Sequence, residues 1–131
     1  MGIHEIETID AAGTFSISNA WASANKGQFV AVPDECYIEA IELNISSISS
    51  LTTLQVVLAY DTNGDDVASA VSGNTAVWAK PGAATHGSVR FTFQSWVRAK
   101  ATPQDLYIFV KGNAGTATCD SARLLYKPRR K

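Results

Sequence analysis

The residues best suited to acid–base chemistry are few and far apart in the sequence. The chain has only two histidines, His4 near the N-terminus and His86 in the stretch 81–87. Neither has a serine, cysteine or carboxylate beside it at a spacing that indicates a catalytic triad, although triad partners meet in space rather than in sequence. We therefore expect two exposed, solvated histidines without a catalytic role.

A pair of carboxylates could serve glycoside cleavage, for which the two groups must lie about 5–9.5 Å apart in a cleft. Glu35, Glu39 and Glu42 are the candidates. Each falls on a polar position of an expected strand, which favours a solvent-facing side chain. The sequence also contains no GxSxG, P-loop or HExxH motif. These observations predict a protein that is not an enzyme.

The acidic segment 61–66 (DTNGDD) is the best local candidate for a metal site. Oxygen ligands at alternate positions, Asp61, Asn63 and Asp65, suit Ca²⁺, which prefers carboxylates and carbonyls. The EF-hand pattern then requires glycine and glutamate where this chain has Asp66 and Ser72. A hairpin turn rich in Asp, Asn and Gly explains the segment without a metal. We expect no metal and no cofactor, with Ca²⁺ at this turn as the minor alternative.

Short stretches of alternating apolar and polar residues recur, separated by Gly, Asn, Asp and Pro at intervals of about 8–12 residues. No segment carries a convincing helical periodicity. In the clearest stretch, 54–60, alternate apolar side chains would face a core, and Asn63-Gly64 supplies the positive φ of a tight turn. The pattern predicts an all-β, antiparallel, jelly-roll-like β-sandwich. Its strands, near eight in number, are expected at 13–20, 27–32, 36–46, 54–60, 74–79, 89–94, 106–110 and 116–126.

One expected strand carries an irregularity. Within 36–46 the apolar phase slips by one residue after Ile38 and Ala40, so that Ile41 begins a new alternation. Such a slip moves side chains to the opposite face of a strand. We therefore expect a β-bulge or a corner near Ala40–Ile41.

The composition is typical of a single domain. The 131 residues are 46% hydrophobic and 18% charged, and 11 basic against 12 acidic residues leave a formal net charge of -1. That near-neutrality argues against a dedicated nucleic-acid binder, which carries a basic face. The sequence has neither a membrane-spanning apolar run nor a secretory signal pattern, so we expect no membrane association and synthesis in the cytoplasm. We predict an arm over 1–12, a sandwich domain over 13–126 and a basic tail over 127–131.

The two cysteines, Cys36 and Cys119, match no metal or redox spacing. In a protein made in the cytoplasm, two buried thiols are the favoured interpretation. A single bridge between them is the alternative, because each falls near a strand end.

Outward-facing aromatic side chains are candidates for binding. Trp96 is out of phase with Phe91 and Phe93 and therefore points outward if its strand is regular. Outward tryptophans mark ligand platforms or protein interfaces. For Trp21 and Trp78 we expect packing in the core or at its rim, with a sugar-stacking platform as the alternative.

Other candidates for partner binding come from one strand and from the two ends. The segment 106–110 is apolar on both faces, which predicts a central strand covered on both sides or one whose second face meets another subunit. Isoleucines recur every three residues in the arm and could fill grooves on a neighbour, while the tail cations could meet acidic patches. The predicted partner-binding residues are Ile3, Ile6, Ile9, Trp96, Tyr107, Phe109, Arg129, Arg130 and Lys131.

Three segments carry a resemblance to a known group of proteins: 21–34, with its Val-Pro-Asp end, 56–64 and 107–112. In these the chain resembles the small jelly-roll virion proteins of tailed bacteriophages, which include capsid decoration or cement proteins and related neck or tail fibre domains. The resemblance implies a non-enzymatic protein that forms symmetric oligomers on a capsid surface and clamps the shell, with termini that reach neighbouring subunits. No site residues are carried over from it.

Three functions follow as hypotheses. The first is a structural virion protein, a capsid decoration protein that bridges subunits of the major capsid protein or other virion subunits as a homo-oligomer, with a trimer favoured. The second is a carbohydrate-binding β-sandwich, such as a tail fibre or receptor-binding domain, with Trp96 or Trp78 as its platform. The third is a hydrolase accessory domain with Ca²⁺ at the turn 61–66. An apolar, symmetric contact surface would favour the first.

Overall fold

The computed structural model is built from strands. It describes residues 6–11, 13–23, 25–32, 35–51, 53–70, 75–76, 87–98, 100 and 104–128, and only the backbone at 69, 70, 75 and 76. The strands are β1 (Glu7–Asp10), β2 (Phe15–Ile17), β3 (Lys26–Val32), β4 (Glu35–Ser49), β5 (Thr53–Ala59), β6 (Val67–Ala70), β7 (Thr75–Ala76), β8 (Gly87–Arg98), β9 (Gln104–Gly112) and β10 (Thr116–Pro128). Among the described residues no helix is long and apolar enough to cross a membrane.

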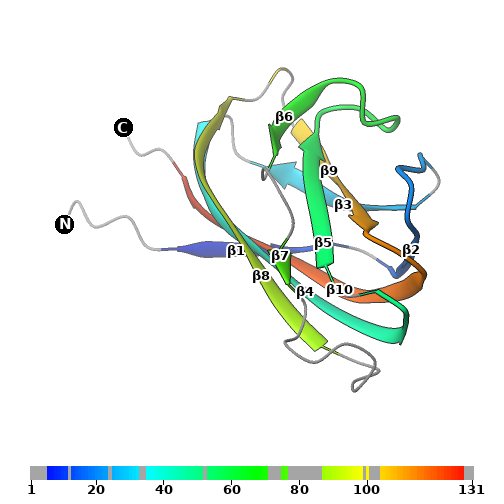
Figure 1. Cartoon of the computed structure of the whole chain (residues 1–131). Helices are drawn as coiled ribbons and strands as arrows, with labels where there is room; N and C mark the ends of the chain where they lie inside the picture. The colour runs from blue at the N-terminus through cyan, green and yellow to red at the C-terminus, as the bar shows by residue number, and fades with distance from the viewer. Residues whose placement is uncertain are drawn as a thin grey trace.

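The strands form two antiparallel sheets that pack against each other (Figure 1). One sheet has the order β1-β10-β4-β8, and β2 also pairs with β10. The other has the order β3-β9-β5-β6, and β7 also pairs with β5. Several successive strands lie in opposite sheets, for example β3, β4 and β5 or β8, β9 and β10, so the chain crosses between the layers repeatedly. The predicted all-β, jelly-roll-like sandwich is confirmed.

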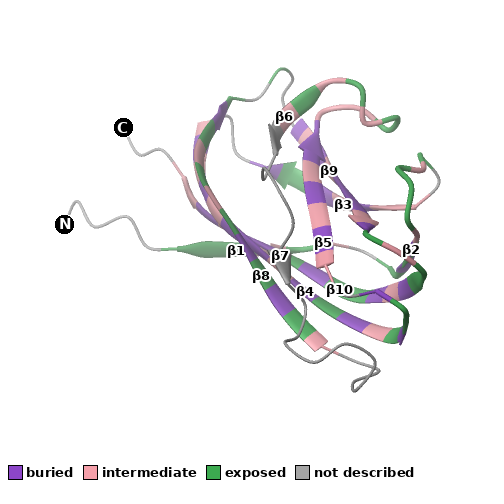
Figure 2. Cartoon of the chain, viewed as in Figure 1, coloured by how far each residue is buried: buried purple, intermediate pink, exposed green. Residues whose placement is uncertain are grey.

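Period-two alternation builds the core between the sheets. In β5, Leu54, Val56 and Leu58 are fully buried while the residues between them are half-buried. Figure 2 shows the same alternation of buried and exposed segments along β4, β8 and β10. Strands with one buried face are held in register, because a slip of one residue would turn every apolar side chain outward. The largest fully buried side chains are Phe29, Phe91, Ile17, Ile38, Ile41, Leu43, Ile45, Leu51, Leu54, Leu58, Leu106 and Ile108.

The expected irregularity in the long strand β4 is confirmed. Ala40 and Ile41 are both fully buried although they are consecutive. The register shifts against β8 between Ile38 and Ala40, and against β10 at the same place, opposite Leu125 and Tyr126. The extra residues let β4 change which side chains face the core without leaving the sheet.

The prediction that residues 1–12 lie outside the strands is wrong for Glu7–Asp10. These residues form β1, which pairs with β10 from Glu7 opposite Tyr126 to Asp10 opposite Arg123. Pairing with a long neighbouring strand stabilises a segment of only four residues, which is too short to show a clear alternation by itself. At the other end, β10 continues to Pro128, two residues into the predicted tail.

Other boundaries also differ from the expectation. The strand expected at 89–94 is longer, because β8 runs from Gly87 to Arg98. The strand expected at 74–79 is described only at Thr75–Ala76. The short strand Val67–Ala70 lacked a clear alternating pattern and was not expected.

Candidate functional site

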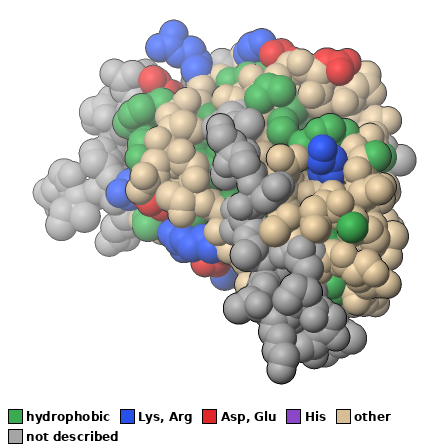
Figure 3. All heavy atoms as spheres, in the orientation of Figure 1, with side chains coloured by type: hydrophobic (Ala, Val, Ile, Leu, Met, Phe, Trp, Pro, Cys, Tyr) green, Lys and Arg blue, Asp and Glu red, His purple; other side chains and the backbone are tan. Residues whose placement is uncertain are grey.

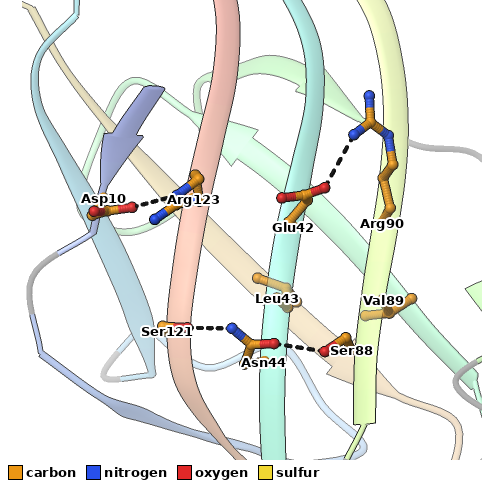
Figure 4. Close-up of a pocket in the computed structure, with 9 residues that line it drawn as sticks. All are labelled: Asp10, Glu42, Leu43, Asn44, Ser88, Val89, Arg90, Ser121 and Arg123. Atoms are coloured by element: carbon orange, nitrogen blue, oxygen red, sulfur yellow. Dashed lines mark hydrogen bonds and ion pairs between the residues drawn. The ribbon is translucent and has the colours of Figure 1, made fainter. Parts of the chain in front are cut away.

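Four side chains of alternating charge form a row across the outer face of the β1-β10-β4-β8 sheet (Figure 4). Asp10 is the register partner of Arg123, Arg123 of Glu42, and Glu42 of Arg90. Arg123 Nε donates to Asp10 Oδ1 at 2.8 Å, and Arg90 Nη1 donates to Glu42 Oε2 at 3.0 Å. The hydrogen bond and charge of Asp10 raise the pKa of Arg123, which keeps that guanidinium charged. We call this set the charged row.

A second row of uncharged polar side chains lies beside it (Figure 4). The Asn44 amide nitrogen donates to Ser121 Oγ at 2.9 Å, and Ser88 Oγ donates to Asn44 Oδ1 at 2.7 Å. The two rows border a shallow hollow of about 490 Å³ that crosses β10, β4 and β8. Its polar groups bond to one another, so the surface is pre-organised rather than a set of freely moving side chains.

An aromatic row crosses the same face near the start of β4. Tyr37 is the register partner of Trp96 on β8 and of Lys127 on β10. The Tyr37 and Trp96 rings meet edge to face, with centroids 5.4 Å apart and an angle of 67°. Lys127 Nζ lies 5.9 Å from the Tyr37 ring centroid and 3.8 Å from Glu39 Oε1.

Trp96 remains 58% exposed, which confirms that it points outward. We define the open face as the outward surface of this sheet. It contains the charged row, the aromatic row and the outward side chains between and beside them: Thr8, Asp10, Tyr37, Glu42, Asn44, Ser88, Arg90, Thr92, Trp96, Ser121, Arg123, Leu125 and Lys127.

The outer face of the β3-β9-β5-β6 sheet is different, because the chain itself covers part of it. Phe109 points outward from β9 but is only 3% exposed. The turn at Gly64 lies over its ring, and Trp21, Val57 and Val67 line a hollow of about 270 Å³ beside it. Of the two interpretations of 106–110, the structure supports a central strand covered on both sides. Phe109 is therefore not available to a partner.

Trp21 sits at the rim of that hollow with its indole 45% exposed. The Lys111 ammonium lies 5.4 Å from the Trp21 ring centroid. Ser23 and Asn63 are the polar side chains that line the same hollow. Trp21 therefore borders the hollow without belonging to the core, and its side chain presents surface to solvent.

The acidic turn is organised by Asp61. Its carboxylate accepts the backbone N–H of Asp66 at 2.9 Å and that of Asp65 at 3.3 Å. These hydrogen bonds, that of Asp66 foremost, lower the pKa of Asp61. Gly64 has a φ of 79°, the left-handed conformation that the Asn-Gly pair predicted. Both Asp61 oxygens serve the turn, and the described residues contain no cluster of three or more metal-ligating side chains.

The two cysteines are buried and unpaired, so the bridge between them is not formed. Burial raises the pKa of Cys36 to about 11 and that of Cys119 to about 12. Thiols in such surroundings stay protonated and are poor nucleophiles.

Of the predicted partner-binding residues, the structure leaves two large apolar side chains exposed. Trp96 lies on the open face, and Ile6, which directly precedes β1, is 46% exposed. Ile9 packs in part against the core, opposite the buried Leu124, so it turns the apolar part of its side chain inward rather than to a neighbour. Tyr107 is half-buried on the outer face of β9. Outside the described residues lie Ile3, Arg129, Arg130 and Lys131, together with His4, Trp78 and His86.

The rows of the open face were not foreseen. Their members come from strands up to 113 residues apart in the chain, as for Asp10 and Arg123. Only the strand order and register bring them together. Alternation along each strand does place the individual residues on the outer face. If the strand order had been known, the alternating charges on neighbouring strands would have indicated the charged row.

In Figure 3 basic and acidic side chains lie close together on the visible surface, and no large area of one sign appears. Among the described residues three further ion pairs follow this pattern: Lys100 with Asp66 at 2.6 Å, Arg98 with Glu35 at 3.9 Å, and Lys127 with Glu39. The face visible in Figure 3 thus carries mixed charges rather than the basic patch that binds a polyanion.

No family model matches the sequence, and no curated protein matches it significantly. Solved structures share the fold. A carbohydrate-binding module of the glycoside hydrolase family 9 enzyme Cel9A from Ruminococcus flavefaciens FD-1 has a TM-score of 0.54 and 11% identity, over 92% of this chain and 98% of that one. The xylan-binding module CBM15 has a TM-score of 0.50 and 13% identity, over 97% and 99%.

A chain of the cyanophage Pam1 capsid asymmetric unit also matches, with a TM-score of 0.51 and 9% identity, over 96% of this chain and 86% of that one. At these identities the likeness shows the fold alone. The fold is thus one that occurs both in a phage capsid and in non-catalytic carbohydrate-binding modules.

Proposed function

We propose that the protein is a structural virion protein of the capsid decoration type, and that its open face docks on the subunits of the shell. The open face carries the proposal. It is a surface across four strands that the described parts of the chain leave uncovered, and it presents an exposed tryptophan at one end of ordered polar rows.

The pairing of its polar groups favours a protein partner. Docking a surface with unpaired charges is costly, since each must lose water without compensation. On the open face Asp10, Glu42 and Asn44 already have partners within the sheet. A protein surface can cover such paired groups at a lower desolvation cost than unpaired charges would carry, while Trp96 supplies the apolar contact that anchors interfaces.

The capsid neighbour supports the same proposal. That chain is aligned over most of its own length, so it is a small chain of similar size rather than a domain of a much larger shell protein. A small protein that binds only the assembled shell shifts the equilibrium toward that shell. No catalytic group is needed for this role.

The test begins with particles purified from the source of the chain, in which mass spectrometry should find the protein at a high, fixed copy number. Particles stripped of it should rebind the recombinant protein. Trp96→Ala should lower the bound fraction strongly, whereas Trp21→Ala, which removes a comparably exposed indole from the other sheet, should bind like the wild type. Absence from the particles, or equal binding of both variants, would overturn the proposal.

Carbohydrate binding is the second candidate, and the hollow at Trp21 is the observation that favours it. The hollow combines an exposed indole with the amide of Asn63 and the hydroxyl of Ser23, a combination suited to a sugar ring. The Trp96–Tyr37 pair suits it less, because rings at 67° do not form a flat platform. The two carbohydrate-binding neighbours share the fold and support this candidate only to that extent.

Affinity electrophoresis in gels containing soluble xylan, and pull-down on insoluble cellulose, test the second candidate. If it is correct, the protein is retarded or bound, and Trp21→Ala loses the effect while Trp96→Ala keeps it. Wild-type mobility unchanged by xylan, with no binding to cellulose, counts against this second candidate function. The two tryptophan variants thus give opposite results for the two functions.

A further inference from the structure

The charged row is open at both ends, and its ends differ in sign. It starts with Asp10 on β1, one edge of the sheet, and finishes with Arg90 on β8, the other edge. The Asp10 side chain is 67% exposed and that of Arg90 is 46% exposed. Each therefore has room for a second partner of opposite charge beyond the one it already contacts.

Exposed apolar side chains also lie at both edges of the open face. Trp96 lies on the β8 edge and is exposed. On the β1 edge Ile6 precedes Thr8 and Asp10 by two and four residues, so alternation places it on the same face. Two of the exposed large apolar side chains thus stand at opposite edges of one sheet face.

Strand direction allows these edges to meet. Every pairing in the sheet is antiparallel, so β1 and β8, which stand three steps apart, run in opposite directions. Within the described residues, β1 forms ladder pairs only with β10, and β8 only with β4. A second copy in the same orientation would therefore add its β1 antiparallel to the β8 of the first.

We propose that copies of this chain associate head to tail, with β1 of one copy extending the sheet at β8 of the next. With Asp10 opposite Arg90, the alternation of charge continues across the boundary without a break. Main-chain hydrogen bonds between the edges supply the adhesion, as in other cases of strand addition. Such a heterologous contact forms a ring if its rotation closes.

The register follows from that charge pair. It sets Thr8 of one copy opposite Thr92 of the next, on the outward side of both strands. Beyond Thr92 the strand β8 is irregular, because Gln94 has a φ of 51° and the register against β4 shifts there, so the expected ladder covers Thr8–Asp10 and Arg90–Thr92.

Charge disfavours the symmetric alternatives. Pairing β8 with β8 about Gln94 would set Arg90 of each copy opposite Arg98 of the other, and pairing β1 with β1 about Asp10 would set the two Asp10 carboxylates opposite each other. Like charges opposite one another destabilise strand pairs. The second copy is therefore favoured as a head-to-tail neighbour. This interface does not depend on whether the open face binds a shell or a glycan.

Engineered cysteines test the contact directly, because the native thiols are buried and protonated. Thr8→Cys and Thr92→Cys are prepared as separate proteins and treated with a short bismaleimide, alone and mixed. We expect crosslinked dimers predominantly in the mixture, and a ladder of higher oligomers from the double variant. Circular dichroism and thermal melting check that every variant is folded.

The second part of the crosslinking experiment reverses the charges of the proposed Asp10–Arg90 pair. Asp10→Arg in the Thr8→Cys protein, or Arg90→Glu in the Thr92→Cys protein, should abolish crosslinking with an unreversed partner. Mixing the two reversed proteins should restore it. The proposal is overturned if the mixture gives no dimer, if either single variant crosslinks with itself as well as the mixture does, or if reversal has no effect.

Discussion

The two outer faces of this sandwich differ in how far their large apolar side chains are exposed. On the β3-β9-β5-β6 sheet the chain covers Phe109 with its own turn at Gly64 and leaves it 3% exposed. On the β1-β10-β4-β8 sheet the described chain leaves Trp96 in solvent, beside rows of paired polar groups. An apolar residue that serves folding is covered from within, whereas one left on an ordered, uncovered surface is available to a partner.

The largest effect expected from this comparison concerns stability. Phe109→Ala should lower the free energy of unfolding by about 3–5 kcal/mol, the cost of emptying a buried aromatic site. Trp96→Ala should cost at most about 0.5–1.5 kcal/mol, because it loses mainly the edge-to-face contact with Tyr37. Urea denaturation of both variants measures the difference. Equal losses would mean that Trp96 belongs to the folding core.

The covering turn itself is the next target. Gly64 has a φ of 79°, and a Cβ built there would lie 3.2 Å from the Phe109 ring. Gly64→Ala should therefore lower the free energy of unfolding by about 1–3 kcal/mol through backbone strain. Gly13→Ala is the matched control, because Gly13 has a φ of 75° and nothing within 4 Å of such a Cβ. A smaller loss for Gly64→Ala than for the control would contradict close packing of the turn on Phe109.

The inner side of the open-face sheet can be probed through its thiols. Folding raises the pKa of Cys36 to about 11 and of Cys119 to about 12 from an ordinary value near 9. The unfolded chain ionises first as pH rises, so the stabilisation is complete below pH 9 and declines through these folded values. Thermal melting from pH 8 to 11 should show that decline. Thiol reagent at pH 8 should label neither cysteine until denaturant is added; rapid labelling of the native protein would show that the core is open.

The smallest effect on stability is expected within the charged row. Arg90→Gln and Glu42→Gln should each change the free energy of unfolding by about 0–1 kcal/mol, because the pair is half exposed. Binding to a partner or crosslinking between copies should suffer more than folding does. Salt titration separates the two effects, since contacts between exposed charges weaken with ionic strength. A loss of several kcal/mol on folding would make the row a structural element instead.

Several features of the fold could be predicted from the sequence because they depend on local alternation. The strands, the β4 irregularity after Ile38 and the outward direction of Trp96 all follow from the period of two. β1 escaped prediction because its pairing with β10, rather than its own composition, holds it in the sheet. The covering of Phe109 by the turn at Gly64 could not be predicted, because a loop that packs on a sheet has no periodic pattern in the sequence. The rows of the open face depend on strand order and register, which one sequence does not encode locally.

The central claim is that the open face, and not the opposite one, meets the partner. Hydroxyl-radical footprinting of the protein, free and bound to particles from its source, tests it most directly by comparing two exposed indoles in one experiment. Binding should protect Trp96 and Tyr37 strongly and leave the modification rate of Trp21 unchanged. Protection of Trp21 with Trp96 still fully reactive would contradict the account and assign the contact to the other sheet.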